Sequence, residues 1–245
     1  MTKTKKEVQR YLDYTKGKFE LDGWWHFTPE HLVKAEPPTA WLVNHNLNED
    51  YWKILYGPVT ANPEKWKDKK AFDIGSGFGG NMRNLLELAE WSSVDGCDIS
   101  GNNAEFATEY LELCGFPSDR FSVYENDGFG LQESADSHYD FVTSIVVLQH
   151  VSLHSVRFNI MKEAFRILKT DGVFSFQLLK SGGTGKPYHF DDVEESLKNR
   201  YNAFTEDNSF LIEDLTKIGF RNIEIVPTAN PGAPTGEWIY VRCEK

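Results

Sequence analysis

The sequence is poor in cysteine, carries no excess of basic charge and has no long hydrophobic run, and each of these absences excludes a class of protein. Its three cysteines form no CxxC pair and leave one over in any disulfide scheme, which favours reduced, buried thiols. No run approaches the roughly 20 apolar residues that a membrane helix needs, and the polar start MTKTKKE lacks the apolar core of a signal peptide. We therefore expect a cytoplasmic protein that has no membrane partner.

The net charge of −11 at pH 7 bears on the choice of partner. Proteins that hold a polyphosphate backbone usually present a basic face, so the charge argues against nucleic acid. No clustered Asp/His pattern indicates a metal site. The length of 245 residues suits one α/β domain with additional segments, present as a monomer or a homodimer.

The segment AFDIGSGFGG at residues 71–80 is the most informative pattern in the chain. It indicates a buried strand that breaks into a glycine turn and continues into a helix with an apolar i, i+3, i+4, i+7 stripe. Because glycine lets the backbone approach a ligand closely, Gly75, Gly77 and Gly79 predict a nucleotide-cofactor site. The turn alone is also typical of nicotinamide, flavin and phosphate sites.

Acidic residues follow at the ends of the next two predicted strands. Asp98 lies about 20 residues beyond the glycine turn, the spacing of a carboxylate that binds ribose hydroxyls. The third strand runs into Asn126, Asp127 and Gly128, where Asp127 could accept a hydrogen bond from an adenine amino group. Two alternatives stay open at this point: Asp98 could cap the helix that begins beside it, and Asn-Asp-Gly is also a common turn sequence.

Two further segments, VLQHV at residues 147–151 and RILKTDG at residues 166–172, carry a family resemblance. Together with the glycine turn and Asp98, they resemble the "VLHHV … RVLKPGG" pattern of the small-molecule branch of class I S-adenosylmethionine-dependent methyltransferases. The resemblance covers residues 66–245. The sequence departs from the pattern at Gln149, Thr170 and Asp171.

The resemblance implies an α/β fold with a doubly wound, mostly parallel seven-stranded sheet, helices on both faces and S-adenosylmethionine as the cofactor. The Pro- and Gly-rich stretch at residues 227–236 is long enough for a hairpin but too short for a helical crossover, so the last strand should be antiparallel. Parallel strands place their ligand-contacting loops at one edge of the sheet. The expected cofactor residues are Asp73, Gly75, Gly77, Gly79, Asp98, Ile99, Asn126, Asp127, Gly128 and Ile145.

Three of these residues have expected roles other than hydrogen bonding to ribose or adenine. Asp73 should order the glycine turn or lie near the amino group of the cofactor. Ile99 and Ile145 should form walls beside adenine and methionine, although ordinary core residues would look the same.

Two regions outside the strand and helix alternation are where substrate contacts are expected. Residues 1–65 form a helical N-terminal extension that could act as a lid, with a helix expected at residues 7–14. Residues 181–207 form an insertion in the methyltransferase domain, with a helix expected over residues 191–201. Their aromatic side chains could wall an apolar or cationic pocket, or could pack the extension onto the domain. The candidate substrate residues are Trp24, Trp25, His26, Tyr188 and His189.

The implied reaction is in-line displacement of the methyl group by a small-molecule oxygen or nitrogen atom. His150 is the candidate general base, because a pKa near 6.5 suits proton transfer at neutral pH; it could instead fix its loop or contact the cofactor. The rivals for this role are His26, His189, Tyr11 and Tyr188.

Two other functions remain as alternatives. A nucleic-acid or protein methyltransferase is disfavoured by the acidic charge and by the lack of an Asn/Asp-Pro-Pro-aromatic motif after the fourth strand, where SIVV stands at residues 144–147. No Pro-Cys pair is present for a covalent cytosine mechanism. The fold could also bind S-adenosylmethionine without transferring methyl.

Overall fold

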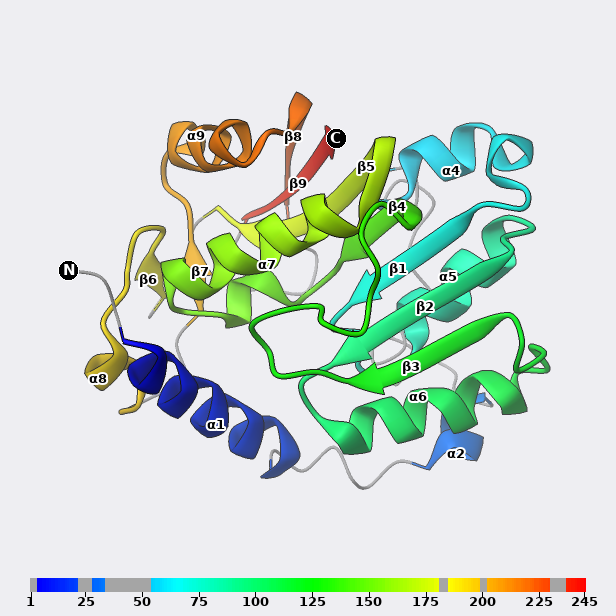
Figure 1. The fold of residues 1–245 in the computed structure, drawn as a ribbon, viewed down its shortest axis with the longest axis horizontal. Coiled ribbons are helices and arrows are strands. Elements are labelled where there is room, and N and C mark those ends of the chain that lie inside the picture. Colours follow the sequence, from blue (N-terminus) through cyan, green and yellow to red (C-terminus); the bar gives the residue numbers. More distant parts are fainter. Residues whose placement is uncertain (1–3, 22–27, 34–53, 181–184, 199–201, 230–236) are drawn as a thin grey trace.

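The computed structural model describes residues 4–21, 28–33, 54–180, 185–198, 202–229 and 237–245. Figure 1 shows a central twisted sheet with helices on both of its faces. The long strands are β1 (Lys70–Ile74), β2 (Ser93–Asp98), β3 (Phe121–Glu125), β4 (Tyr139–Ser144), β5 (Leu168–Leu179), β8 (Arg221–Ala229) and β9 (Glu237–Glu244).

The order and direction of these strands define the fold. Strands β3, β2, β1, β4 and β5 are neighbours in that order and are all parallel. Strand β9 lies between β5 and β8 and is antiparallel to both. The prediction of a doubly wound α/β sheet with an antiparallel last strand is confirmed.

The insertion adds two strands that the sequence patterns did not indicate. They are β6 (Lys186–Pro187) and β7 (Ala203–Phe204), of two residues each. Strand β7 is parallel to β5 through the pair Leu179 and Phe204, and β6 pairs with β7. The predicted helix over residues 191–201 is reduced to the four-residue α8 (Val193–Ser196) in the described part of that segment.

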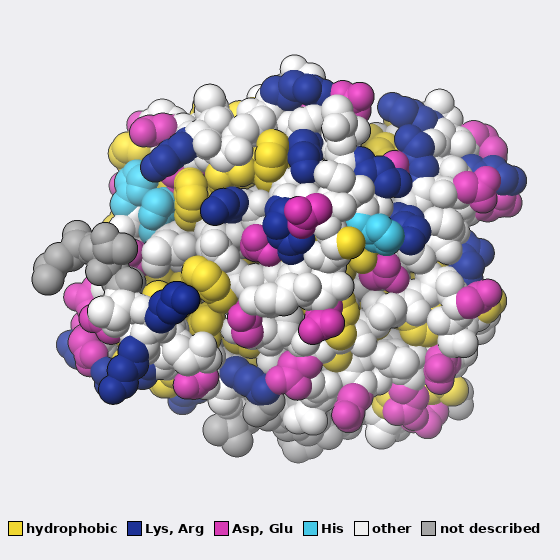
Figure 2. All heavy atoms as spheres, viewed as in Figure 1, with side chains coloured by type: hydrophobic (Ala, Val, Ile, Leu, Met, Phe, Trp, Pro, Cys, Tyr) yellow, Lys and Arg dark blue, Asp and Glu magenta, His cyan; other side chains and the backbone are white. Residues whose placement is uncertain are grey.

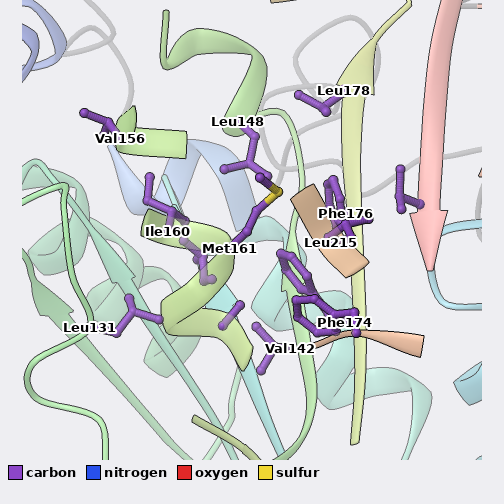
Figure 3. Packing of buried hydrophobic residues seen from close by; sticks show 14 of the residues in the cluster. Leu131, Val142, Leu148, Val156, Ile160, Met161, Phe174, Phe176, Leu178 and Leu215 are labelled. Carbon is purple, nitrogen blue, oxygen red and sulfur yellow. The ribbon is translucent and has the colours of Figure 1, made fainter. Parts of the chain in front are cut away.

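Side chains of the sheet alternate between two hydrophobic cores, as the period of a strand requires. Phe72, Val142 and Phe174 face the core under α7 (His154–Ile167) and α9 (Asn208–Ile218), part of which Figure 3 shows. Ala71 and Phe141 face the opposite core. The helices over that second core are α4 (Gly57–Ala61), α5 (Gly80–Leu88) and α6 (Gly101–Leu113).

The N-terminal extension contains a longer helix than the sequence predicted. The predicted helix covered residues 7–14, whereas α1 runs over Lys5–Leu21. In Figure 1, α1 lies on the side of the sheet toward which the arrows of β1 and β3 point. Two further described elements of the extension and its junction are α2 (Pro29–Val33) and η3 (Pro63–Trp66).

Backbone turns shape the end of β4 and the start of β5. Strand β4 ends at Ser144, and the short η4 (Leu148–His150) follows it. Within β5, Asp171 takes a φ of 62°, and the pairing of β5 with β4 shifts register. A left-handed residue of this kind is typical of a bulge, which interrupts a strand without ending it.

The sequence is 26% charged residues, and charged side chains of both signs lie on the surface. On the face seen in Figure 2, Lys and Arg side chains are interspersed with Asp and Glu. None of the helices in the described residues is long and apolar enough to cross a membrane.

Candidate functional site

A cavity of about 330 Å³ opens at the edge of the sheet where the parallel strands end. Its walls come from the turn after β1, the loops after β2, β3 and β4, and one face of α1. The volume is at the lower end of the roughly 300–1,000 Å³ that is typical of small-ligand sites. The position is the one that ligands occupy in open α/β sheets.

The glycine turn after β1 is fixed to β2 and open toward the pocket. The backbone N–H groups of Gly75 and Ser76 both donate to the carbonyl of Cys97, at 2.8 and 2.9 Å. Gly75 and Gly77 have φ values of 75° and 51°, a region that side chains other than glycine rarely occupy. A Cβ on Gly75 would lie 2.3 Å from Val147 Cγ2, whereas a Cβ on Gly77 would meet no atom within 4 Å.

Gly79 has a packing role in this turn. It is the N-terminal cap of α5, with a φ of 87°, and a Cβ there would lie 3.2 Å from Ala107 Cβ. It does not line the pocket, in contrast to Gly75 and Gly77. Gly79 therefore allows α5 to approach α6 closely. The sequence predicted that Gly79 contacts the cofactor, but Gly79 is not among the residues that line the pocket.

Asp98 joins the end of β2 to the glycine turn. Its Oδ2 accepts a hydrogen bond from Gly77 N at 3.0 Å, and its Oδ1 accepts from Ser100 N at 2.9 Å and Asn103 Nδ2 at 3.1 Å. Burial raises the pKa of the Asp98 carboxyl, and these hydrogen bonds oppose the rise. A carboxylate has about four acceptor positions, so Asp98 both caps the local backbone and keeps capacity for a ligand hydroxyl.

Asp73 is buried beneath the same turn and is outside the pocket lining. The side chain is fully inaccessible, and neither carboxylate oxygen has a hydrogen-bond partner. Burial, and then the negative charge of Asp98, raise its pKa well above the usual range. The side chain of Asp73 thus accepts no hydrogen bond from the glycine turn, and its expected place near the amino group of the cofactor stays a prediction.

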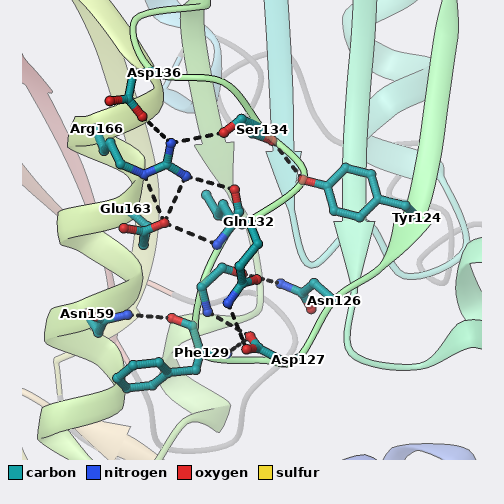
Figure 4. Close-up of polar contacts among 12 residues, drawn as sticks. Tyr124, Asn126, Asp127, Phe129, Gln132, Ser134, Asp136, Asn159, Glu163 and Arg166 are labelled. Carbon is teal, nitrogen blue, oxygen red and sulfur yellow. Dashed lines mark hydrogen bonds and ion pairs between the residues drawn. The ribbon is translucent and has the colours of Figure 1, made fainter.

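The loop after β3 contributes Asn126 and Gly128 to the pocket but not Asp127. Asp127 Oδ1 accepts from the N–H groups of Phe129 and Gly130, and Oδ2 accepts from Gln132 Nε2, all at 2.8 Å. Figure 4 shows this carboxylate directed at its own turn. The turn alternative of the Asn-Asp-Gly sequence describes Asp127, and the structure does not bring its carboxylate to the pocket.

Apolar residues after β2 and β4 complete the pocket floor. Ile99 and Ile145 both line it, as the sequence predicted. Gly128 has a φ of 73°, which favours glycine, and a Cβ there would lie 2.5 Å from the terminal Cδ1 of Ile99. Val146, next to Ile145 and also in the lining, has a φ of 60°, a strained conformation for a β-branched residue and one that clusters at functional sites.

One face of α1 closes the pocket, and three of its four lining residues were missed at the sequence level. Tyr11, Leu12, Thr15 and Phe19 line the cavity, and only Tyr11 was named, as a rival base. The Tyr11 hydroxyl accepts a hydrogen bond from Ser152 N at 3.0 Å. The spacing i, i+1, i+4, i+8 marks one face of a helix, so extending the predicted helix by two turns would have found this face.

His150 lies in η4 and lines the pocket beside Phe19 of α1. Its Nδ1 is 2.9 Å from Asn202 Oδ1, and its Nε2 is 3.4 Å from Gln149 Nε2. The ring of Phe19 meets the imidazole edge to face, with 6.4 Å between centroids. Within the described lining the ionisable side chains are Tyr11, Asp98 and His150, and none is a lysine or arginine.

The predicted substrate residues divide into two groups. Trp24, Trp25 and His26 lie outside the described residues. Tyr188 is 3% exposed, and its hydroxyl donates to Asp214 Oδ2 at 2.8 Å. His189 packs against Phe210, with 4.6 Å between ring centroids.

Tyr188 and His189 therefore lie beside α7 and α9 and not at the pocket. The physical reason is that the insertion folds its aromatic residues onto the helices that cover the sheet. Their assignment to the substrate site has no support in the geometry of the described residues.

Tyr188→Phe tests this placement. We expect the free energy of unfolding to fall by about 1–3 kcal/mol, because the buried Asp214 loses a hydrogen-bond donor, while turnover and cofactor affinity stay unchanged. Urea denaturation and a turnover assay on the same preparation would measure both quantities. Reduced turnover at unchanged stability would return Tyr188 to the substrate site.

No group of three or more His, Cys, Asp or Glu side chains is arranged to hold a metal ion in the part of the chain that the structure describes. The polar side chains in the described lining are two hydroxyls (Thr15 and Ser76), three asparagines and the three ionisable groups named above. Such a set suits a ligand with hydroxyl groups and an apolar ring.

Comparison with known proteins finds a domain family that matches part of the chain. Residues 72–176 match the methyltransferase domain family. An uncharacterized protein of Haemophilus influenzae is 33% identical over 117 residues, which are 43% of this chain and 46% of that protein. A polyamine aminopropyltransferase of Clostridioides difficile is 28% identical over 193 residues, which are 76% of this chain and 60% of that protein. The chain thus spans about half the length of the relatives that it matches.

Solved structures share the fold at low sequence identity. Phosphoethanolamine N-methyltransferase 2 of Haemonchus contortus, in complex with phosphomonomethylethanolamine and S-adenosylhomocysteine, has a TM-score of 0.57 at 16% identity, over 78% of this chain and 52% of that one. Geranyl diphosphate C-methyltransferase of Streptomyces coelicolor, in complex with Mg²⁺, geranyl diphosphate and S-adenosylhomocysteine, has a TM-score of 0.62 at 12% identity, over 96% and 97% of the two chains. Residues 72–176 thus match a methyltransferase domain, and the described residues share the fold of these S-adenosylmethionine-dependent methyltransferases.

Proposed function

We propose that this protein transfers a methyl group from S-adenosylmethionine to an oxygen or nitrogen atom of a small molecule. The observation that carries the proposal is the hydrogen bond from Gly77 N to Asp98 Oδ2, which joins the glycine turn to a buried carboxylate at the wall of the pocket. A glycine turn after the first strand and a carboxylate after the second are the two elements that bind an adenosyl group and its ribose hydroxyls in parallel α/β sheets.

The residues present fit this cofactor in two respects. No protein atom lies within 4 Å of the position that a Cβ on Gly77 would take, so a ligand can approach the backbone closely there. Asp98 keeps acceptor capacity after its three hydrogen bonds. When bound, the cofactor supplies a methyl group activated by a sulfonium. The residues that would hold it are Gly75, Gly77, Asp98, Ile99, Asn126, Gly128 and Ile145.

The side of the pocket formed by α1 and η4 is the proposed substrate side. Leu12 and Phe19 of α1 and Val151 after η4 make it apolar, and Tyr11 and His150 are its ionisable groups. An acceptor molecule with an apolar body and one hydroxyl or amino group matches this surface. In this arrangement α1 acts as the lid of the N-terminal extension.

Catalysis in such a site rests mainly on positioning. Holding the nucleophile about 3 Å from the methyl carbon and in line with the breaking bond contributes several kcal/mol. A hydroxyl or ammonium acceptor must also lose a proton, and His150 at the pocket wall is the group whose ordinary pKa suits a general base at neutral pH.

Aminopropyl transfer to a polyamine is the second candidate, because the relative from Clostridioides difficile bears that name. A polyamine carries several positive charges, and acidic side chains would be expected to face them. Asp98 is the single acidic side chain in the described lining, and it is already assigned to ribose. Methyl transfer therefore stands first.

A turnover assay with methyl-labelled S-adenosylmethionine and fractions of a metabolite extract tests the proposal. We expect label in a small organic product, and at a cofactor concentration below saturation at least several-fold less label with Asp98→Ala as the comparison variant. A parallel reaction with decarboxylated S-adenosylmethionine and putrescine tests the second candidate. Product in that reaction alone would contradict methyl transfer, and cofactor binding without any product would favour a non-catalytic binding protein.

A further inference from the structure

We propose that Asn202 is a positioning residue that fixes the tautomer of His150, so that Nε2 of His150 carries the lone pair of a general base. The inference rests on the methyl transfer proposed above and adds a residue to it. His150 lines the pocket, and its Nδ1 lies 2.9 Å from Asn202 Oδ1.

The two amide groups around the imidazole agree on one tautomer. The carbonyl oxygen of Asn202 can only accept a hydrogen bond, so Nδ1 of a neutral His150 must carry the hydrogen. The amide nitrogen of Gln149 can only donate, and it lies 3.4 Å from Nε2, which places the lone pair on Nε2. That contact is long for an N–H···N bond, so a substrate hydroxyl or amine could replace it.

The fold holds both partners by their backbones. His150 N donates to the carbonyl of Val147 at 2.8 Å, which closes η4 at the end of β4. Lys186 N donates to the carbonyl of Asn202 at 2.7 Å, and Thr205 N donates to Leu179 at 2.9 Å. The short strands β6 and β7 therefore fasten Asn202 to the end of β5, next to the loop that carries His150.

This arrangement gives the insertion a function in the site. Residue 202 comes directly before β7, whose single pair with β5 is Phe204 with Leu179. Without the two short strands, no described hydrogen bond would hold Asn202 at the imidazole. Preorganisation of a base by a neighbouring side chain reduces the cost of reaching the reactive geometry.

The proton transfer balances with the methyl transfer. The substrate oxygen or nitrogen forms a bond to the methyl carbon while the methyl–sulfur bond breaks, and the electron pair of that bond stays on sulfur. His150 Nε2 takes the proton of the substrate. The positive charge thereby passes from the sulfonium to the imidazolium, whose Nδ1–H still donates to Asn202.

The position of the imidazole proton can be measured without turnover. In the wild-type protein with a neutral His150 imidazole, we expect ¹⁵N NMR to report a protonated Nδ1 and an unprotonated Nε2. In Asn202→Ala we expect a mixture of the two tautomers. Asn202→Asp keeps an oxygen acceptor at the same place, so it should keep the wild-type tautomer. Gln9→Ala, which removes an exposed amide that donates to Asp13, is the matched control and should change nothing.

Turnover and binding complete the test. Asn202→Ala should lower kcat about tenfold or more, because a general base contributes on the order of 10²–10⁴ in rate, and should leave the affinity for S-adenosylhomocysteine within twofold. Asn202→Asp should restore part of the lost kcat. This split between kcat and affinity would not follow from a purely structural role.

Two results would overturn the inference. One is a wild-type His150 that carries its proton on Nε2, which would mean that both amides are turned the other way. The other is a loss of kcat in Asn202→Ala without any change of tautomer. If the wild-type protein shows the expected tautomer and binds S-adenosylhomocysteine but methylates nothing, the proposed function and the base role fail while the tautomer assignment stands.

Discussion

Asp98→Ala is expected to weaken the affinity for S-adenosylmethionine at least tenfold. The variant removes the carboxylate that would accept a hydrogen bond from a ribose hydroxyl. A hydrogen bond to a charged group contributes about 1.5–3 kcal/mol, and about 1.4 kcal/mol is a factor of ten in affinity. It also releases Gly77 N from its 3.0 Å contact with Oδ2, so the glycine turn loses its link to β2. Isothermal titration calorimetry measures the affinity directly.

Asp127→Ala is the matched control for this experiment. Asp127 follows the next strand of the sheet, but it is exposed and hydrogen-bonds within its own turn. We expect its affinity to stay within about twofold of wild type, because water can replace an exposed carboxylate. Equal losses in the two variants would support the sequence-level assignment of Asp127 to adenine, and unchanged affinity in Asp98→Ala would remove the ribose assignment.

Gly75→Ala is expected to lower the free energy of unfolding by about 2–5 kcal/mol. The φ of 75° costs a residue with a Cβ about 1–2 kcal/mol. The new Cβ would lie 2.3 Å from Val147 Cγ2, and relieving such an overlap in a packed region costs about 1–3 kcal/mol more. Chemical denaturation of both proteins under the same conditions would measure the difference.

Gly77→Ala separates the two costs. Gly77 has a similar φ of 51°, but a Cβ there would meet no protein atom within 4 Å. We expect a stability loss of about 1–2 kcal/mol from the backbone alone, together with weaker cofactor binding, because the methyl group would enter the pocket. If both variants lost the same free energy of unfolding, the overlap of a Cβ at residue 75 with Val147 would add no cost to the backbone strain.

Features that depend on local sequence were predictable. The glycine turn and the acidic residue after β2 each follow from a few consecutive residues. The antiparallel last strand followed from the shortness of its connection, at residues 227–236. Gly219 ends α9 with a φ of 119°, as a glycine at the end of an apolar stripe predicts.

Features that depend on long-range packing were not predictable from local patterns. The sequence around Tyr188 and His189 does not reveal that they pack against Asp214 and Phe210, residues brought together only by the tertiary fold. The local sequence allowed Asp127 either to bind adenine or to stabilise a turn. Its hydrogen bonds within the turn show the second role.

The site gained its substrate side from the same kind of long-range contact. Tyr11 and Phe19 meet Ser152 and His150 across more than half of the chain, so the sequence could suggest a lid but could not name its face. Asn202 escaped notice because an isolated asparagine in an insertion carries no motif, and only its distance to His150 Nδ1 gives it a role.

The central claim is that the pocket between the glycine turn and Asp98 binds the adenosyl group of S-adenosylmethionine. Calorimetric titration of the wild-type protein with S-adenosylhomocysteine, and separately with NAD⁺, tests it most directly. The account predicts one binding site per chain for S-adenosylhomocysteine and no measurable heat with NAD⁺. Saturable binding of NAD⁺ in the absence of any binding of S-adenosylhomocysteine would contradict it.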